Sequence, residues 1–277
     1  MILSGTQLLD ALIEDCKEPC GEKLAVILIG ENPASRIYVQ AKMAACAKAK
    51  IETKLIELPP EINQARLSEE ILALNHDPAV TGILLQLPLP GHLCATKATA
   101  LIDPKKDVDG LTPTNMGKLL LGDTTGVVPC TPLGITMLLE RNNLSVSGKR
   151  ALILGRSAIV GRPLAALWMQ KKPGGNATVT LAHTLTKDID KLLLEADIVV
   201  AAMGRPAFVK RVKKGAIVID VGITDMGLAP SGKRRLQGDV DFEAVSPLAS
   251  FITPVPGGVG PMTIAALITN IKQAAKL

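Results

Sequence analysis

A tyrosine and a lysine stand four residues apart in the segment NPASRIYVQAK, and this tyrosine is the only one in the chain. The segment starts with Asn32 followed by Pro, which predicts a helix that begins at residue 33. Tyr38 and Lys42 are then neighbours on one face of that helix. A lysine amine can move a proton during catalysis, and a phenol can order substrate or water. The spacing alone leaves a second interpretation open, because Tyr and Lys also cover ordinary amphipathic surfaces.

Three further polar residues stand at positions where their polarity or charge needs an explanation. Gln86 interrupts the apolar run GILLQLPLP at the end of a predicted strand, where an amide is costly unless it is hydrogen-bonded. Asp107 and Asp109 lie in the loop DPKKDVDGLTP. A structural turn explains one of these two acids, but it does not explain the glutamine. The three residues are therefore candidates for a chemical site.

Apolar runs rich in Val and Ile alternate with longer segments of helical period, which is typical of a parallel sheet with crossover helices. The predicted fold class is therefore α/β. In the first half the predicted strands are residues 24–30, 53–58 and 80–87, and the predicted helices are residues 33–49, 64–75, 114–121 and 132–142. The first of these helices directly follows a strand, so its first turns lie at the carboxyl end of the sheet, where such proteins bind ligands.

The second half restarts the alternation. Its predicted strands are residues 150–155, 177–183, 196–202 and 215–222, and its predicted helices are about residues 162–171, 188–194 and 262–275. The loop-rich stretch 119–132 lies between the two series. We therefore predict a first domain over residues 1–121 and a second over residues 122–261, with the C-terminal helix, about 262–277, packing back on the first.

The segment GRSAIVGRP joins a predicted strand to a predicted helix. Its small residues Gly155, Ser157 and Gly161 stand where a phosphate-binding turn needs close backbone approach, and the helix amides and dipole then face an anion. The spacing G-x-S-x-x-x-G differs from the dinucleotide pattern G-x-G-x-x-G. An ordinary turn between strand and helix therefore stays open as an alternative.

The end of the next predicted strand carries His183 and Thr184, where an NAD enzyme usually has an acid for the ribose hydroxyls. With Arg156 in the preceding loop, a 2′-phosphate fits better than a free hydroxyl, which favours NADP. Arg156 as a solvated cation and Thr184 as a plain hydroxyl at a strand end are the alternatives.

Composition narrows the class of partner. A chain of 277 residues is long enough for two domains. Its hydrophobic share of 47% is typical of a globular protein, and its aromatic share of 2% leaves almost nothing to stack on nucleobases. The net charge of +5 is mild and comes from scattered basic residues. These features favour small anionic molecules over nucleic acid.

The sequence also argues against a membrane span and a metal centre. Its apolar runs are far shorter than the roughly 18 residues that a span needs, and the start MILSGTQLLDALIEDCK lacks the basic region of a signal peptide, so we expect a cytoplasmic protein. Five cysteines without a C-x-x-C pair argue against a disulfide framework and a zinc ribbon. His92 with Cys94 is too small a set for a metal site, and we expect none.

Seven motifs together resemble one family: NPASRIYVQAK, GILLQLPLP, DVDGLTPTNMGKL, PCTPLGI, GRSAIVGRP, GDVDF and TPVPGGVGPMT. The family is the bifunctional methylenetetrahydrofolate dehydrogenase/methenyltetrahydrofolate cyclohydrolase family, known in bacteria as FolD. The motifs occur in family order over about residues 24–270. The resemblance implies an α/β substrate domain and a Rossmann-type NADP-binding domain with a cleft between them. It also implies a homodimer.

The activity that the resemblance implies is oxidation of 5,10-methylenetetrahydrofolate with NADP, followed by hydrolysis to 10-formyltetrahydrofolate. Such an enzyme belongs to one-carbon metabolism, which serves purine biosynthesis. Two other functions stay open: a nucleotide-binding regulatory protein that kept the fold and lost the reaction, and a Rossmann dehydrogenase for a different acid substrate. The complete catalytic set argues against the first. The lack of a paired His and acid argues against the second.

By the same resemblance, Lys42 moves protons in the hydrolytic step, Gln86 holds its amine, Tyr38 forms a wall, and Asp109 binds the pterin. An Asp can accept paired hydrogen bonds from a pterin as it does from a guanidinium. The further substrate contacts that we expect are Leu85, Leu87, Pro256, Gly257 and Gly260. The expected cofactor contacts are Gly155, Arg156, Ser157, Gly161, Thr184, Ile223 and Thr263.

Overall fold

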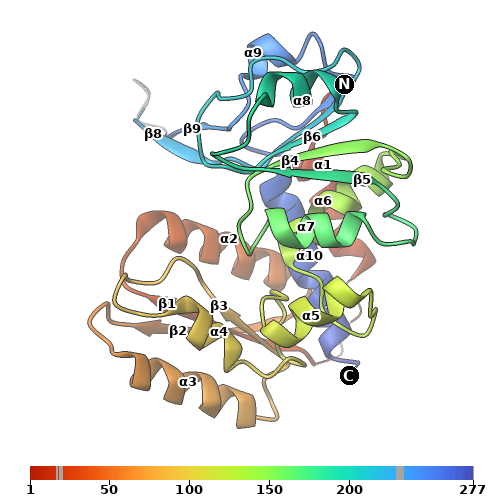
Figure 1. The fold of residues 1–277 in the computed structure, drawn as a ribbon. Coiled ribbons are helices and arrows are strands. Elements are labelled where there is room, and N and C mark those ends of the chain that lie inside the picture. The colour runs from red at the N-terminus through yellow and green to blue at the C-terminus, as the bar shows by residue number, and fades with distance from the viewer. Residues whose placement is uncertain (17, 19–20, 229–233, 277) are drawn as a thin grey trace. The chain divides into compact units, whose positions relative to one another are not determined.

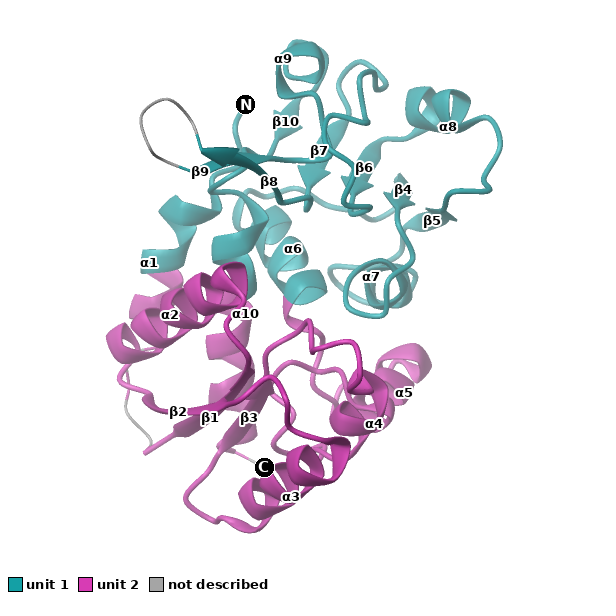
Figure 2. Ribbon diagram, turned by 90° about the vertical axis from the view of Figure 1, so that its left-hand side faces the viewer, with its two compact units in different colours: residues 1–10, 131–263 teal, residues 11–130, 264–277 magenta. Residues whose placement is uncertain are grey.

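The computed structural model describes residues 1–16, 18, 21–228 and 234–276, and Figure 1 shows their helices and strands. The chain divides into two compact units, which Figure 2 colours separately. Unit 1 consists of residues 1–10 and 131–263, and unit 2 of residues 11–130 and 264–277. The bounds that we gave for the functional domains stay a prediction.

Unit 2 is built on three parallel strands in the order β2-β1-β3. These are β1 (Lys23–Ile29), β2 (Glu52–Leu58) and β3 (Gly82–Leu85), and the helices that lie wholly in the unit are α2 (Pro33–Lys48), α3 (Gln64–His76), α4 (Ala95–Ala100) and α5 (Pro113–Leu121). Strand β1 pairs on both sides and is buried over residues 24–29, which explains its unbroken apolar run. Leu67, Ile71 and Leu74 of α3 pack in the same core at helical spacing.

Helix α2 begins as its sequence predicts. The Asn32 side chain accepts hydrogen bonds from the backbone N–H groups of Ala34, at 3.0 Å, and Ser35, at 3.1 Å. Pro33 takes the first helical position, where its missing N–H is no loss. This cap and the preceding strand place the first turns of α2 at the carboxyl end of β1.

The loop after α4 shows different roles for Asp107 and Asp109. The buried Asp107 carboxylate accepts hydrogen bonds from the backbone N–H groups of Leu111, at 3.1 Å, and Thr112, at 2.8 Å. It also accepts one from the Asn115 side chain, at 2.8 Å. Asp107 is therefore the acid that holds the turn, and Asp109 is left for another role.

Unit 1 contains a parallel sheet of five strands in the order β10-β7-β6-β4-β5. Its strands are β4 (Arg150–Leu154), β5 (Thr178–Ala182), β6 (Ile198–Ala201), β7 (Ile217–Asp220) and β10 (Phe251–Ile252). Strand β4 lies between β5 and β6, so the chain reverses its direction across the sheet after β5. Ligands of doubly wound folds bind at the carboxyl ends of the strands at such a point.

Helices α7 (Gly161–Trp168), α8 (Ile189–Glu195) and α9 (Phe242–Val245) lie wholly in unit 1. A separate antiparallel pair, β8 (Thr224–Leu228) and β9 (Arg234–Gln237), completes the unit. Helices α1 (Gly5–Asp15), α6 (Cys130–Arg141) and α10 (Val259–Ala274) have residues in both units.

Each predicted strand and helix overlaps an observed one, but several elements were missed. The longest of them is α1, for which the sequence analysis predicts no helix and considers only a signal peptide. The pair β8–β9 was missed because its first strand is mostly exposed and has no apolar alternation. The remaining missed elements, α4, α9 and β10, are each six residues or shorter. The last helix begins at Val259 rather than at 262, so the helix includes Gly260.

Two buried carboxylates organise the loops at the carboxyl ends of β6 and β7. Asp220 accepts hydrogen bonds from the backbone N–H groups of Gly222, Asp239 and Val240, at 3.0, 2.8 and 2.9 Å. Asp239 in turn accepts from Met203, Gly204 and Arg205, at 2.7, 2.9 and 2.7 Å. Asp239, the first of the two acids in the GDVDF motif, therefore fixes the backbone of residues 203–205.

Burial raises the pKa of Asp220 to about 6, against the three N–H groups that lower it. The folded protein therefore binds more protons than the unfolded chain between about pH 4 and pH 6, and the free energy of unfolding should fall as pH rises through this window. The expected loss from this group is about 3 kcal/mol. Urea unfolding of the wild type and of Asp220→Asn at several pH values measures it.

Asp225→Asn, in the exposed β8 strand, is the matched control and should keep the wild-type pH dependence. If Asp220→Asn also keeps it, Asp220 is not the titrating group.

Candidate active site and cofactor pocket

Lys42 and Gln86 meet although 44 positions separate them in the sequence. The Lys42 ammonium donates a hydrogen bond to the Gln86 side-chain oxygen at 3.0 Å. The Gln86 side-chain amide donates to the Leu87 carbonyl at 2.6 Å, and the Gln86 backbone N–H to the Ile27 carbonyl at 3.0 Å. The amide that interrupts the apolar run is therefore satisfied, and it fixes the amine of a lysine that is only 9% exposed.

Asp109 lies near the same amine. As a residue it is half-buried, but its carboxyl group lies among protein atoms, and this burial raises its pKa. The charge of Lys42 and a hydrogen bond with the Cys130 thiol oppose that rise in the pKa. Lys42, Gln86 and Asp109 thus form one cluster in unit 2. Tyr38 lies one turn before Lys42 on α2, 36% exposed.

A buried residue that the sequence analysis missed supports this cluster. Asn270 of α10 is fully buried, and its side-chain amide donates to the carbonyls of Val108 and Val128, both at 2.9 Å. The Cys130 thiol donates to the Val108 carbonyl at 3.3 Å. The residue just before Asp109 is therefore held from two sides. An Asn that interrupts the largely apolar stretch 264–271, late in the helix, was the available signal.

Two other expected substrate contacts flank Gln86. Leu85 is the last residue of β3, is 5% exposed and packs in the core of unit 2. Leu87 is half-buried and packs against the same core. Both set the position of Gln86, and their contact with a substrate stays a prediction.

A pocket of about 340 Å³ opens at the carboxyl ends of β4, β5 and β6 in unit 1. Four of the expected cofactor contacts line it: Gly155, Arg156, Ser157 and Thr184. The sequence analysis missed the residues contributed by the loop after β6, among them Met203, Arg205 and Phe208. That loop has no phosphate-binding pattern, and only the pairing of β6 with β4 brings it here.

The turn after β4 requires glycine at two places. Gly155 has a φ of +112°, and a Cβ there would lie 2.1 Å from the Ala202 carbonyl oxygen. A Cβ on Gly161 would lie 2.0 Å from the Gly155 carbonyl oxygen. Ser157 accepts a hydrogen bond from the Val160 backbone N–H at 3.1 Å, next to the start of α7. Gly161 therefore lets the start of α7 pack closely against the turn, whereas Gly155 also lines the pocket.

Replacing Gly155 with Ala should destabilise the protein by about 3 kcal/mol, because the new methyl group combines a steric clash with a backbone conformation that L residues avoid. Chemical denaturation measures this loss. Gly148→Ala is the matched control, since Gly148 also has a positive φ, +71°, but no atom near the added methyl group. It should cost only about 1 kcal/mol. Equal losses would show that the close approach to Ala202 is unimportant.

The pocket is positively charged. Two arginines line it, Arg156 from the loop after β4 and Arg205 from the loop after β6, and none of the described lining residues is Asp or Glu. A cofactor with free ribose hydroxyls is usually met by an acid at this place, and a 2′-phosphate by an arginine. The pocket therefore fits a phosphorylated ribose.

Two family models match nearly the whole chain. The catalytic domain of tetrahydrofolate dehydrogenase/cyclohydrolase matches residues 3–109, and the NAD(P)-binding domain of the same proteins matches residues 129–277. The chain belongs to the tetrahydrofolate dehydrogenase/cyclohydrolase family.

Relatives within the family are close. The bifunctional protein FolD of Protochlamydia amoebophila is 51% identical over 260 residues, covering 92% of this chain and 87% of the relative. The crystal structure of FolD from Campylobacter jejuni has a TM-score of 0.93 and 44% identity, covering 100% of this chain and 98% of that one. The Trypanosoma brucei FolD, solved with NADP and an inhibitor, has a TM-score of 0.93 and 35% identity, covering 100% and 97%.

These findings confirm the predicted family and the α/β fold class. They also confirm the prediction of an enzyme with oxidoreductase and hydrolase activity on folate one-carbon units.

Five residues that the family resemblance brings into the site lie in unit 1 but do not line the 340 Å³ pocket. They are Ile223, Pro256, Gly257, Gly260 and Thr263. Ile223, just after β7, is 41% exposed, so its apolar side chain is accessible to a ligand. The Gly257 carbonyl accepts hydrogen bonds from the backbone N–H groups of Gly5 and Thr6, at 2.9 and 3.1 Å. Thr263 shares a hydrogen bond with Thr131 at 3.1 Å. Their ligand contacts stay predictions.

Neither a membrane span nor a metal cluster is found in the part of the chain that the structure describes. No helix there is long and apolar enough to cross a bilayer. No three His, Cys, Asp or Glu side chains gather there as possible metal ligands. Cys46, Cys94 and Cys130 are free thiols, and Cys20 lies outside the described residues.

Proposed function

We propose that the chain oxidises 5,10-methylenetetrahydrofolate to 5,10-methenyltetrahydrofolate with NADP and then hydrolyses the product to 10-formyltetrahydrofolate. The observation that carries this proposal is the buried amine of Lys42 between the Gln86 amide and the Asp109 carboxyl group. These three groups come from distant parts of the sequence. The hydrogen bond of the Lys42 amine goes to a neutral amide, whereas a purely structural cluster would favour an ion pair.

In this proposal Lys42 moves protons in the hydrolytic step. Water adds to the methenyl carbon, and the five-membered ring then opens as a nitrogen leaves. A proton must pass from the water to that nitrogen, and an amine held by a neutral amide oxygen can give and take it. Gln86 fixes the position of Lys42 through the 3.0 Å hydrogen bond.

Asp109 supplies the group that recognises the pterin. Two carboxylate oxygens can accept hydrogen bonds from the 2-amino group and the neighbouring ring N–H. Asp107 and Asn270 hold the loop around it, so little ordering is left for the moment of binding. The partly exposed ring of Tyr38 offers an apolar wall.

The acid-free pocket with Arg156 and Arg205 suits NADP, the cofactor in the Trypanosoma brucei complex. The chemistry that NADP would supply when bound is an acceptor for the hydride of the methylene carbon. The residues of this chain contribute by binding, since Gly155 lets the backbone approach a phosphate and Arg156 offers charge for the 2′-phosphate.

The test is an assay of the purified protein with methylenetetrahydrofolate and either NADP or NAD. Reduced cofactor and methenyltetrahydrofolate should appear together with NADP, and the methenyl absorbance should then decay faster than without protein. NAD should support a slower reaction at equal concentration. If neither cofactor is reduced, the proposal fails, and a regulatory protein that kept only the fold becomes the better explanation.

We also infer a cytoplasmic homodimer. Its support is the family resemblance, in which the cofactor domains pair through sheet edges. Sedimentation equilibrium of the full chain checks the dimer, and a single species near 29 kDa, the mass of one chain, would contradict it.

A further inference from the structure

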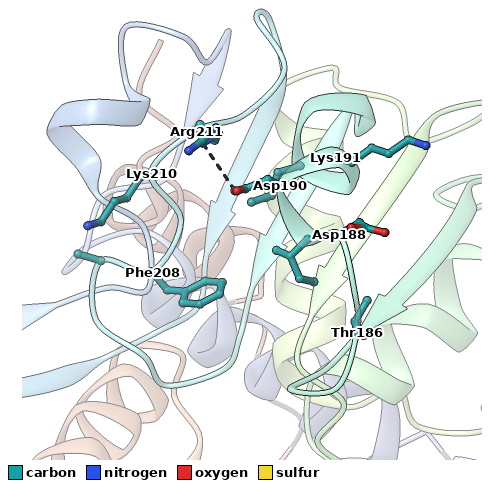
Figure 3. A pocket seen from close by; sticks show the side chains of 10 residues that line it. Thr186, Asp188, Asp190, Lys191, Phe208, Lys210 and Arg211 are labelled. Atoms are coloured by element: carbon teal, nitrogen blue, oxygen red, sulfur yellow. Dashed lines mark ion pairs between the residues drawn. The ribbon is translucent and has the colours of Figure 1, made fainter.

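The cofactor pocket borders a second cavity. This cavity is a larger groove of about 900 Å³ and shares three lining residues with the pocket: Thr186, Ile189 and Phe208. In Figure 3 the Phe208 ring points from the segment 207–211 toward the segment that carries Thr186 and Asp188. Phe208 is one of only three phenylalanines in the chain, and it stands where the two cavities meet.

The Arg205 guanidinium lies over this ring. Its guanidinium carbon is 4.7 Å from the centroid of Phe208, within the range of a cation–π contact. The backbone is fixed as well, because the Arg205 N–H donates to the buried Asp239 carboxylate at 2.7 Å. Arg205 is therefore a preorganised group, although its side chain is exposed.

The charge of Arg205 is also uncommitted. In the neighbouring groove Arg211 pairs with Asp190 at 3.6 Å, the pair drawn in Figure 3. Within the described part of the chain, no carboxylate pairs with the Arg205 guanidinium, and no acid lines the pocket into which it faces. A guanidinium held on one face by an aromatic ring keeps its other face for a flat group and its N–H edge for an anion.

We propose that Arg205, stacked on Phe208, determines cofactor specificity: its free face takes the adenine base, and its N–H edge takes the 2′-phosphate together with Arg156. This inference rests on the proposed NADP-dependent function. It adds a residue outside the phosphate-binding turn, on the loop that Asp239 organises.

Binding of two probes to the full chain, adenosine 2′,5′-bisphosphate and adenosine 5′-monophosphate, separates the two contacts. Arg205→Gln removes the charge, and the dissociation constant of the bisphosphate should rise about tenfold, which corresponds to 1.4 kcal/mol. The constant of the monophosphate should rise only about threefold. Phe208→Leu keeps apolar volume but removes the ring, and should weaken both probes by the same factor.

Arg211→Gln is the matched control, because Arg211 lies nearby but does not line the cofactor pocket. It should bind both probes as the wild type does. With saturating NADP, the turnover number of Arg205→Gln should stay near the wild-type value while its KM for NADP rises. A merely structural role would instead lower turnover and thermal stability together.

Unchanged binding of the bisphosphate to Arg205→Gln overturns the inference, and so does an equal loss in Arg211→Gln, which would indicate long-range charge alone. Wild-type protein that binds neither probe and reduces no NADP contradicts the proposed function itself. The two failures are therefore distinguishable.

Discussion

Replacing Lys42 with Met should lower the cyclohydrolase rate by roughly a hundredfold to ten-thousandfold, the range that a positioned proton carrier contributes. Met keeps the length and apolar stem of the side chain but cannot donate to Gln86 or carry a proton. Gln86 is half-buried, so water can take over the lost hydrogen bond, and the fold should persist. The decay of methenyltetrahydrofolate with and without protein measures the rate.

Binding distinguishes a lost proton carrier from a damaged site. Lys42→Met should bind folate with an affinity within a few-fold of the wild type and should still reduce NADP, since hydride transfer needs alignment rather than proton transfer. Lys48→Met, at the exposed end of the same helix, is the control and should retain both activities. An unchanged cyclohydrolase rate in Lys42→Met would remove Lys42 from its proposed role.

Replacing Asp109 with Asn should reduce both activities by roughly two to three orders of magnitude in kcat/KM. The amide keeps one acceptor, so one hydrogen bond loses its charge assistance, at about 1 kcal/mol. Its N–H₂ group faces a pterin donor, so the other hydrogen bond is lost, at about 1.5–3 kcal/mol. Most of the loss should appear as a higher KM for the folate. Steady-state kinetics of both reactions and direct folate titration measure it.

Stability provides the contrast. Burial raises the pKa of Asp109, which means that its charge is costly in the folded protein, so Asp109→Asn should not lower the midpoint of thermal unfolding. Asp107→Asn should lower it, because that carboxylate accepts three hydrogen bonds within its loop. A wild-type KM for the folate in Asp109→Asn would exclude Asp109 from the pterin site.

Local rules predicted much of the fold because the relevant interactions are short in sequence. Asn32 and Pro33 act within one helical turn, and the apolar run of β1 reports a strand paired on both sides. The same rules missed α1 and the β8–β9 pair. Helix α1 packs its first residue against the backbone of Gly258, an approach that no local pattern encodes.

The candidate site divides in the same way. The sequence by itself determined that Tyr38 and Lys42 share a helical face, that Gln86 needs a partner, and that one acid of DPKKDVDG is spare. The family resemblance implied that Gln86 holds the Lys42 amine and that Asp109 binds the pterin. Without it, only the tertiary structure decided that the partner of Gln86 is Lys42 and that Asp107 is the acid that holds the turn. The physical reason is that hydrogen bonds within one or two turns follow from backbone geometry, whereas contacts across 44 positions depend on strand order and register. The same reason hid Asn270, Asp239 and the stacked pair of Arg205 and Phe208 until the chain was folded.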